Sequence, residues 1–283
     1  MNFASFLLLL SSSWLIIGCQ SERILFLTSV CFKSHKISFM PIAETLAERG
    51  HQVTVITPFP AAKKHDNLHE ITLGGQGENE LGVNWFQMQK QNPITATLGT
   101  LNNLRSSAEA GYVRLMTNEE FQTILRNRSV DLVVVLAVLN DFALPLIDYL
   151  QVPYIFFSAT INVPWHLKAM GAEQQYAYIP GFGSHFNSEM SFTQRMINMI
   201  RIEILIAVRQ MTLIKPLDQL IAKDFPNARS IGELEREAQL SIINGKTTIT
   251  WPRPLPPTIV TIGALHVRPP QPLPQVQFKI CIL

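Results

Sequence analysis

The sequence has few cysteines and few charged residues. Cysteine occurs only at Cys19, Cys31 and Cys281, and these three show neither the close spacing of a zinc site nor the pattern of a disulfide framework. Charged residues make up 16% of the chain and the formal net charge is +2, so the composition does not indicate a basic surface. We therefore expect no nucleic-acid partner and no metal centre.

Long apolar runs are lacking as well. Residues 4–17 are largely apolar but too few to span a bilayer, and small residues follow them. This plan predicts a secretory signal peptide over residues 1–21 and a location in the lumen of the endoplasmic reticulum. No lysine or arginine precedes the run, so a retained N-terminal anchor is the alternative. A glycosylation sequon at Asn127 agrees with a lumenal chain.

Glycine is absent from the loop that follows the first predicted strand. The loop reads TSVCFKSH, residues 28–35, whereas a dinucleotide-binding loop needs glycines so that its backbone can approach the pyrophosphate. The loop contains a histidine instead, His35. In an open α/β sheet ligands lie beyond the carboxyl ends of the strands, so His35 is either a general base at that edge or an incidental loop residue.

Residues 23–58 are predicted to form a strand, a helix and a second strand. The two strands are the short apolar runs ILFL and VTVI, which are typical of strands buried on both faces of a parallel sheet. Apolar residues recur at helical spacing from Phe39 to Ala47, with Pro41 expected in the first turn and Gly50 as a C-terminal cap at positive φ. The crossover must be right-handed.

The alternation of strands and helices continues along the chain. Thr117 and Glu120 have the spacing of a capping box, which predicts a helix ending near Arg126. We predict one doubly wound, Rossmann-like α/β domain with a parallel sheet over residues 22–267. The other predicted strands are residues 131–136, 153–158, 240–244 and 258–265, and the other predicted helices are residues 95–116, 143–150 and 234–238.

Residues 61–82 are predicted to be irregular. His65 and His69 lie four apart, as zinc ligands on one helix face do, but no further ligand follows at a suitable spacing. A solvated loop or helix is therefore the prediction.

Several segments resemble the animal UDP-glycosyltransferases. They are SHKISFMPIAETLAERGHQVTVITP (34–58), VLND (138–141), MSF (190–192) with Arg195 and Asn198, and IGALH (262–266) before Leu273-Pro274. The resemblance implies the N-terminal half of the two-domain architecture known as GT-B. It also implies sugar transfer from a UDP-sugar to a hydroxyl of a small lipophilic acceptor, with His35 removing the hydroxyl proton. The UDP-sugar would be a co-substrate, and no further cofactor is implied.

The resemblance also implies a carboxylate at or just beyond the end of the predicted strand 131–136, and this carboxylate would orient the histidine. The aligned position holds Leu136, which cannot play this role, and the nearest carboxylate is Asp141. Asp141 is therefore either the orienting acid or merely the cap of the helix that follows.

The acceptor pocket is expected to involve four residues. In the resembling family this half of the enzyme shapes the pocket, which points to Trp85 and Phe86 and, after a later strand, to Trp165 and His166. Ordinary core packing is the alternative for these side chains.

Residues 192–215 are apolar but interrupted by charges, which excludes a spanning helix. Two interpretations stay open: a helix packed on the domain, or an amphipathic helix that rests on a membrane surface.

The chain ends in a proline-rich stretch, residues 268–283, where the resembling family passes to its nucleotide-sugar half. We expect a linker and a truncated tail without that donor domain, and hence no transfer by this chain alone. Two explanations are open. One is an incomplete copy of an enzyme; the other is a non-catalytic lumenal binder or a regulatory partner of full-length family members.

Overall fold

The computed structural model describes residues 21–61, 64–74, 93–159, 163–181, 184–246 and 250–267, and it describes no side chain in residues 93–98 or at residue 100. Residues 1–20 of the predicted signal peptide, Trp85, Phe86 and the tail over residues 268–283 lie outside the described residues and stay predictions.

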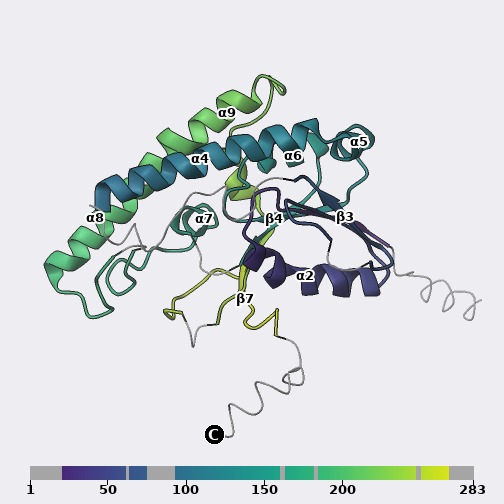
Figure 1. Cartoon of the computed structure of the whole chain (residues 1–283). Helices are drawn as coiled ribbons and strands as arrows, with labels where there is room; N and C mark the ends of the chain where they lie inside the picture. Colours follow the sequence, from purple (N-terminus) through teal and green to yellow (C-terminus); the bar gives the residue numbers. More distant parts are fainter. Residues whose placement is uncertain are drawn as a thin grey trace, which may run out of the picture.

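Seven parallel strands form one sheet in the order β3-β2-β1-β4-β5-β6-β7, so the predicted doubly wound α/β fold is confirmed. The sheet lies between two layers of helices (Figure 1). The strands are β1 (Arg23–Leu27), β2 (Gln52–Thr57), β3 (Leu68–Thr72), β4 (Leu132–Leu136), β5 (Tyr154–Ser158), β6 (Leu240–Ile243) and β7 (Ile259–Thr261).

The central strands are apolar on both faces because helices cover both. In β1, Leu25 and Leu27 point into one core and Ile24 and Phe26 into the other. The second core contains α2, and the first contains most of the other helices. The helices are α2 (Lys33–Glu48), α4 (Pro93–Thr117), α5 (Glu119–Asn127), α6 (Ala143–Leu150), α7 (Pro164–Ala169), α8 (Phe192–Arg209), α9 (Lys215–Ile221) and α10 (Ile231–Leu234), with a π-helix η2 (Gln210–Ile214) and a 3₁₀-helix η3 (Glu235–Glu237).

Helix α2 begins earlier than its apolar pattern predicts. It starts at Lys33, so His35 lies in the first turn rather than in the loop, and Pro41 lies inside the helix rather than in its first turn. Proline lacks the N–H that would bond to the carbonyl of Ile37. Ile37 is 53% exposed, so water can take the place of the missing donor. Gly50 has a φ of 92°, as predicted for the residue after the helix.

Strand β3 lies within the stretch that was predicted to be irregular. It pairs with β2 at the edge of the sheet, where His69 stands opposite Thr54, so the prediction of a loop or helix is wrong there. Its sequence LHEIT lacks the alternating pattern of a half-buried strand, and only Ile71 is fully buried.

The cap of α5 also differs from the prediction. Asn118, not Thr117, caps the helix, because its Oδ1 accepts the N–H of Phe121 at 2.9 Å. Thr117 is the last residue of α4, and Glu120 pairs with His69 at 2.6 Å. Glu120, the acid of the expected capping box, thus pairs with a residue of β3 instead.

Helices α8 and α9 are joined through η2 and run alongside α4 (Figure 1). The inner face of α8 buries Asn198, Ile202 and Arg209. Its outer face leaves Phe192 and Ile204 exposed. Among the residues that the structure describes, no helix combines the length and the apolarity needed to cross a membrane.

Candidate functional site

The sheet reverses its strand order between β1 and β4, and ligands of open α/β sheets bind in the crevice beyond such a point. One side chain joins the two loops there. Asn140, which follows β4, accepts the N–H of Val30 at 3.0 Å and donates to the carbonyl of Val30 at 2.9 Å. Leu139 beside it has a φ of 71°, which is uncommon for a residue with a bulky side chain. The loop after β4 is therefore held in one conformation against the loop after β1.

His35 lies five residues after Val30 of this Asn140–Val30 clamp, in the first turn of α2, and is half-buried. Its ring packs edge-on against Phe32, with 5.2 Å between the ring centroids. Its Nδ1 atom is buried and has no hydrogen-bond partner in the part of the chain that the structure describes. Burial lowers the pKa of His35, and a helix N-terminus also disfavours the imidazolium. The side chain is therefore neutral at pH 7 and can accept a proton.

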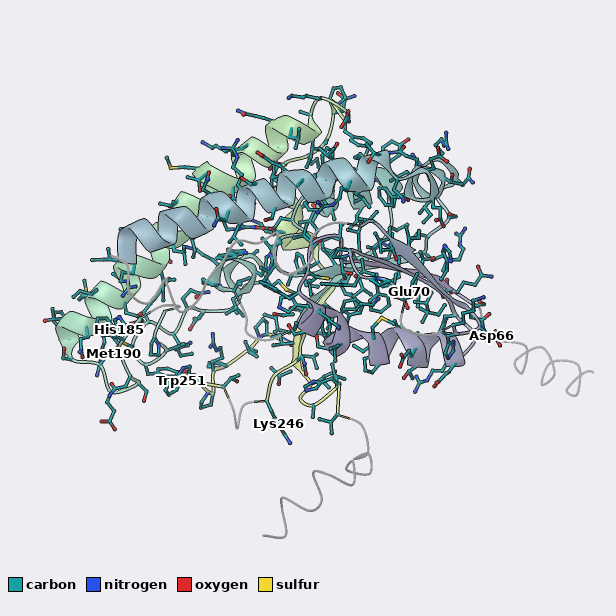
Figure 2. The ribbon with its side chains drawn as sticks, in the orientation of Figure 1. Asp66, Glu70, His185, Met190, Lys246 and Trp251 are labelled. Atoms are coloured by element: carbon teal, nitrogen blue, oxygen red, sulfur yellow. The ribbon has the colours of Figure 1, made fainter. Side chains whose placement is uncertain are left out.

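Lys36 fixes the backbone next to His35. Its Nζ lies 2.6 Å from a carboxylate oxygen of Glu70 and donates to the carbonyl of Pro60 at 2.9 Å. Glu70 belongs to β3 and its side chain is buried (Figure 2). The edge strand missed by the sequence pattern thus anchors the first turn of α2 and, with it, the backbone of His35.

Leu136, the last residue of β4, faces the α2 side of the sheet. It is buried in the same core as Cys31 and Phe39, which lie four residues before and after His35. A carboxylate at this position would point toward α2, but leucine offers no acceptor. The Nδ1 of His35 has no described partner, which agrees with the prediction that the orienting acid is missing at position 136.

Asp141 does not cap α6, and its predicted role beside His35 has no described contact. The N-cap residue of α6 is Phe142, whose side chain cannot accept a hydrogen bond from the first N–H groups of the helix. Asp141 is therefore not the capping residue of α6. No described hydrogen bond joins Asp141 to His35 either. Its carboxylate contacts His166 and Arg209 instead. A catalytic role for Asp141 stays a prediction without a contact that supports it.

Four buried side chains form an ion cluster around Asp141: Asp141, His166, Arg209 and Glu235. Nη2 of Arg209 donates to Asp141 Oδ1 at 2.8 Å and to Glu235 Oε1 at 2.5 Å. Nε2 of His166 lies 3.1 Å from Asp141 Oδ1 and 3.6 Å from Glu235 Oε1. All four residues are at most 5% exposed. Each charge of the cluster is therefore balanced within the protein and not by water.

The pKa values in the cluster follow from burial and pairing. Burial alone would lower the pKa of His166, but the hydrogen bonds to Asp141 and Glu235 outweigh it, so this pKa is raised. Burial alone would raise the pKa of Asp141, but the charge of Arg209 and the bond to His166 outweigh it, so this pKa is lowered. Glu235 follows the same pattern as Asp141. The cluster therefore favours two carboxylates with two cations.

Asp141, His166 and Glu235 also offer the atom types and the close spacing of a metal site. The Nη2 atom of Arg209 already contacts one oxygen of each carboxylate. A metal ion at that position would face a buried guanidinium, so the cluster as described does not fit a metal.

Of the two predicted acceptor residues that the structure describes, Trp165 is partly accessible. One face of its ring lies against the Arg209 guanidinium, 4.7 Å from the ring centroid, and its Nε1 is buried without a described partner. Its neighbour His166 is 5% exposed and stacks on Phe156. The ring of His166 is enclosed by the ion cluster and Phe156, and its contact with an acceptor stays a prediction.

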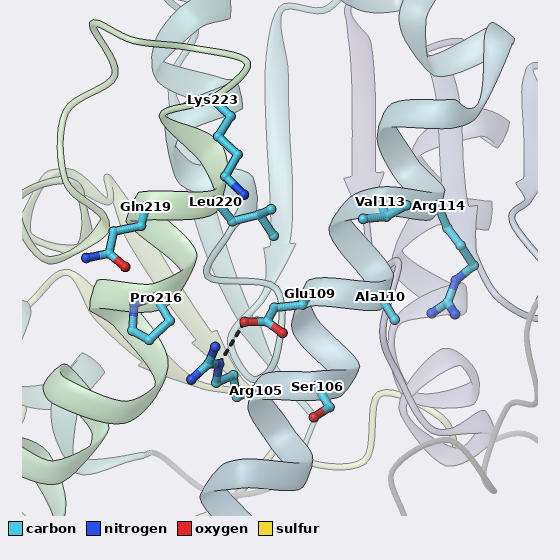
Figure 3. A pocket seen from close by; sticks show the side chains of 10 residues that line it. All are labelled: Arg105, Ser106, Glu109, Ala110, Val113, Arg114, Pro216, Gln219, Leu220 and Lys223. Carbon is cyan, nitrogen blue, oxygen red and sulfur yellow. Dashed lines mark hydrogen bonds and ion pairs between the residues drawn. The ribbon is translucent and has the colours of Figure 1, made fainter.

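A groove of about 790 Å³ lies elsewhere, between α4 and α9 (Figure 3). Arg105 and Glu109 on α4 form an ion pair of 2.7 Å inside it. None of the predicted site residues lines this groove. Asn127, the predicted glycosylation site, is exposed at the end of α5, and its modification stays a prediction.

Sequence reasoning missed Arg209 and Glu235. Arg209 follows Ile202 by seven residues and Asn198 by eleven, so all three lie on one face of α8, and that face is buried. This spacing was the available signal for Arg209. Glu235 had no comparable signal, because a short 3₁₀-helix carries no periodicity.

Comparison with known proteins adds the family. Residues 25–280 match the model of the family described as UDP-glucoronosyl and UDP-glucosyl transferase. The chain is 30% identical over 249 residues to UDP-glucosyltransferase 2 of Dactylopius coccus, with 86% of this chain and 48% of that protein covered. It is 24% identical to human UDP-glucuronosyltransferase 1A3, with 86% and 47% covered.

Among solved structures, a UDP-glucosyltransferase from Polygonum tinctorium capable of glucosylating indoxyl superposes with a TM-score of 0.43 at 13% identity, covering 90% of this chain and 55% of that one. The chain spans about half the length of the curated relatives that it matches. Because the family model covers nearly the whole sequence, the chain belongs to the UDP-glucoronosyl and UDP-glucosyl transferase family.

Proposed function

We propose that this chain is the acceptor-binding half of a UDP-glycosyltransferase that transfers a sugar from a UDP-sugar to a hydroxyl of a small lipophilic compound. The observation that carries the proposal is His35. It stands beyond the carboxyl end of β1, beside the point where the strand order reverses, with a lowered pKa and an unpartnered ring nitrogen. Membership of the family supplies the reaction class.

In this proposal His35 is the general base. The acceptor oxygen forms a bond to the anomeric carbon of the sugar while the bond from that carbon to the UDP oxygen breaks, and the hydroxyl proton passes to His35. UDP leaves with the electron pair of the broken bond. A neutral imidazole suits this step because one of its two ring nitrogens carries no hydrogen and can accept the proton.

The donor side is proposed to lie outside these 283 residues, because the relatives are about twice as long as the matched region. Without a bound UDP-sugar the base has no reaction to assist, so we expect no turnover by the chain alone. The test incubates the purified chain with several UDP-sugars and a panel of phenols, with His35→Ala as the matched control. Turnover clearly above that control would contradict a need for a separate donor half.

The second candidate function is that of a non-catalytic lumenal binder or a regulatory partner of full-length family members. This second candidate is kept because the chain covers only 48% of UDP-glucosyltransferase 2. Sequencing transcripts beyond the codon for Pro274 separates the two. A reading frame that continues into a second half supports the enzyme, and a stop codon in every transcript supports the binder.

We also propose that the chain is lumenal and contacts the membrane surface through α8. Phe192 and Ile204 lie on the outer face of α8 and are 79% and 56% exposed, and Arg195 beside them is basic and exposed. An apolar stripe with flanking cations suits an anionic bilayer surface. Flotation with phosphatidylserine vesicles tests this: Phe192→Ser with Ile204→Ser should reduce binding, whereas Ile37→Ser on α2 should not. Equal flotation of the variants would contradict the contact.

The alternative to the predicted signal peptide, a retained N-terminal anchor, calls for a separate measurement. Alkaline carbonate extraction of microsomes releases a peripheral lumenal chain. Retention in the pellet would show that residues 4–17 stay on as an anchor.

A further inference from the structure

We propose that Arg209 is a positioning residue for acceptor binding: through the ion cluster it holds the loops after β4 and β5 and fixes the ring of Trp165, and it does so only while His166 is protonated. This inference rests on the proposed function, because it takes the carboxyl edge of the sheet as the acceptor side.

The cluster joins four separate elements. Asp141 lies between β4 and α6, His166 in α7 after β5, Glu235 in η3, and Arg209 at the end of α8. Strands β4 and β5 are parallel neighbours, so both loops leave the same edge of the sheet. One guanidinium therefore ties two edge loops to the helical layer.

The tie extends to the loop before His35. Asp141 follows Asn140, and Asn140 is hydrogen-bonded in both directions to Val30. A shift of Asp141 would therefore be transmitted through one peptide unit to the clamp between the loops. The cluster thus acts on the reaction edge without touching the reacting atoms.

Arg209 also supports Trp165 directly. The ring of Trp165 rests on the guanidinium at 4.7 Å and meets His166 edge-on at 6.1 Å. A planar cation held by two carboxylates is a fixed platform for an aromatic ring. Arg209 lies at the junction of α8 with η2, and π-helical turns of this kind occur often at functional sites.

Charge balance makes the arrangement depend on His166. Two buried carboxylates face one guanidinium, so a neutral His166 leaves one buried negative charge without compensation. The described charged groups that face His166 are Asp141 from the loop after β4 and Glu235 from η3, with Arg209 from α8 beyond both. Phe156 of β5 and Trp165 close the remaining sides with uncharged rings.

The first test follows the position of Trp165 without any ligand. In the full chain Trp14, Trp85 and Trp251 are replaced by phenylalanine, and acrylamide quenching of the remaining tryptophan is measured from pH 6 to pH 9. Quenching should increase as the pH rises, because His166 loses its proton. Quenching that does not change with pH would overturn the inference.

The variant Arg209→Lys separates the effect of the positive charge from the effect of the planar guanidinium under Trp165. A single nitrogen, Nη2, makes both contacts to carboxylates, so lysine can keep the charge balance but cannot stack as a plane on Trp165. We expect increased quenching with a melting temperature within about 4 °C of the parent chain. Arg195→Lys, on the same helix but exposed, is the matched control and should change neither value.

The second test measures binding of 2-naphthylmethanol, a lipophilic alcohol that does not ionise in this pH range. Arg209→Lys should weaken binding by about three- to thirtyfold, the range expected for a lost cation–π contact, while its melting temperature stays within about 4 °C of the parent chain. Binding by the parent chain should weaken as the pH rises. The charge-balanced double variant His166→Gln with Glu235→Gln keeps the Asp141–Arg209 pair and should bind with an affinity that does not depend on pH.

The outcomes distinguish the two proposals. A parent chain that binds no alcohol at any pH contradicts the proposed function, and the quenching test then decides whether Arg209 positions Trp165. Alcohol binding that is equal in the parent chain and in Arg209→Lys overturns the inference and leaves the proposed function standing. The same holds for a pH dependence that survives in the double variant.

Discussion

His35 and His166 both follow strands of one parallel sheet, yet their surroundings shift their pKa values in opposite directions. His35 has no carboxylate partner in the described structure, and burial lowers its pKa. His166 is more deeply buried, but two carboxylates lie within 3.6 Å of its Nε2 and raise its pKa. Burial acts in the same direction on both side chains, so the partners decide the difference.

This comparison shows how the placement of one acid divides two roles between two histidines. Leu136 is the last residue of β4, and Asp141 follows it by five residues. The acid points into the core beneath α8, where it keeps His166 charged, and the leucine lies on the α2 side, where His35 is left neutral. The sheet edge thus holds one histidine suited to accept a proton and one suited to hold a loop in place.

The largest effect is expected from His35→Ala. In a chimera that adds the donor half of a related full-length enzyme, the change should lower turnover by about two to four powers of ten, the usual contribution of a positioned acid–base group. Acceptor binding should persist, because the imidazole contributes proton transfer and little apolar contact. Steady-state kinetics with a phenol acceptor measure the effect. A loss of less than threefold would remove His35 from the mechanism.

Asp141→Asn should act mainly on stability. Asparagine keeps the shape but leaves Arg209 and His166 with one carboxylate between them, and breaking such a buried pair costs about 3 kcal/mol. Urea unfolding measures this cost. Asp66→Asn, at an exposed position, is the matched control and should change the free energy of unfolding by less than about 0.5 kcal/mol.

The activity of Asp141→Asn in the chimera then tests the predicted relay. Turnover per folded molecule should stay within a few-fold of the parent, because Asp141 has no described contact with His35. A fall as large as that of His35→Ala would show that Asp141 orients the base after all.

Leu136→Asp should give a smaller effect of opposite sign. The new carboxylate would lie on the α2 side of β4, where it can bond the unpartnered Nδ1 of His35 and raise the pKa of that ring. We expect turnover in the chimera to increase about tenfold. Leu136→Asn is the control of equal shape without charge. Equal activity in both variants would show that no acid is needed at position 136.

The smallest effects are the opposite pH slopes of stability that the two histidines produce. The pKa of His166 is raised above 6.5, so its contribution to the free energy of unfolding is complete below pH 6.5 and is lost as the pH rises through the folded value. The pKa of His35 is lowered, so its contribution is complete above pH 6.5 and falls as the pH drops toward the folded value.

Urea unfolding between pH 5.5 and pH 9 can resolve these slopes. His166→Gln should differ most from the parent chain at low pH and least at high pH. His35→Gln should be more stable relative to the parent at low pH than at high pH. Parallel curves for either variant would contradict the protonation state assigned to that histidine.

The sequence predicted the fold well because the fold depends on local patterns. Apolar runs marked β1, β2, β4, β5 and β6, and helical spacing marked α2 and α6. Strand β3 was not predicted, because an edge strand buries few side chains and its sequence shows no clear alternation of apolar and polar residues. The start of α2 was predicted too late, because the first turn is partly exposed and its residues precede the apolar stripe.

The site was predictable only in part, for a different reason. His35 was found because its position after a strand is itself informative. The partners of Asp141 are His166 and Arg209, which lie 25 and 68 residues away, and nothing local indicates such a pairing. Leu136 was identified only through the resemblance to the family, since a leucine at the end of a buried strand is otherwise ordinary.

The π-helix η2 also affects how the chain can change in length. A π turn contains one residue more than an α-helical turn, so it absorbs that residue without the rotation of about 100° that it would otherwise impose on the helix that follows. Deleting one residue between Gln210 and Ile214 should therefore restore a regular α-helix and leave Arg209, Leu217 and Ile221 on their buried faces, whereas deleting two should turn Leu217 and Ile221 away from the core. Among homologues we expect this segment to differ in length by at most one residue and other insertions and deletions to gather in the turn after α9.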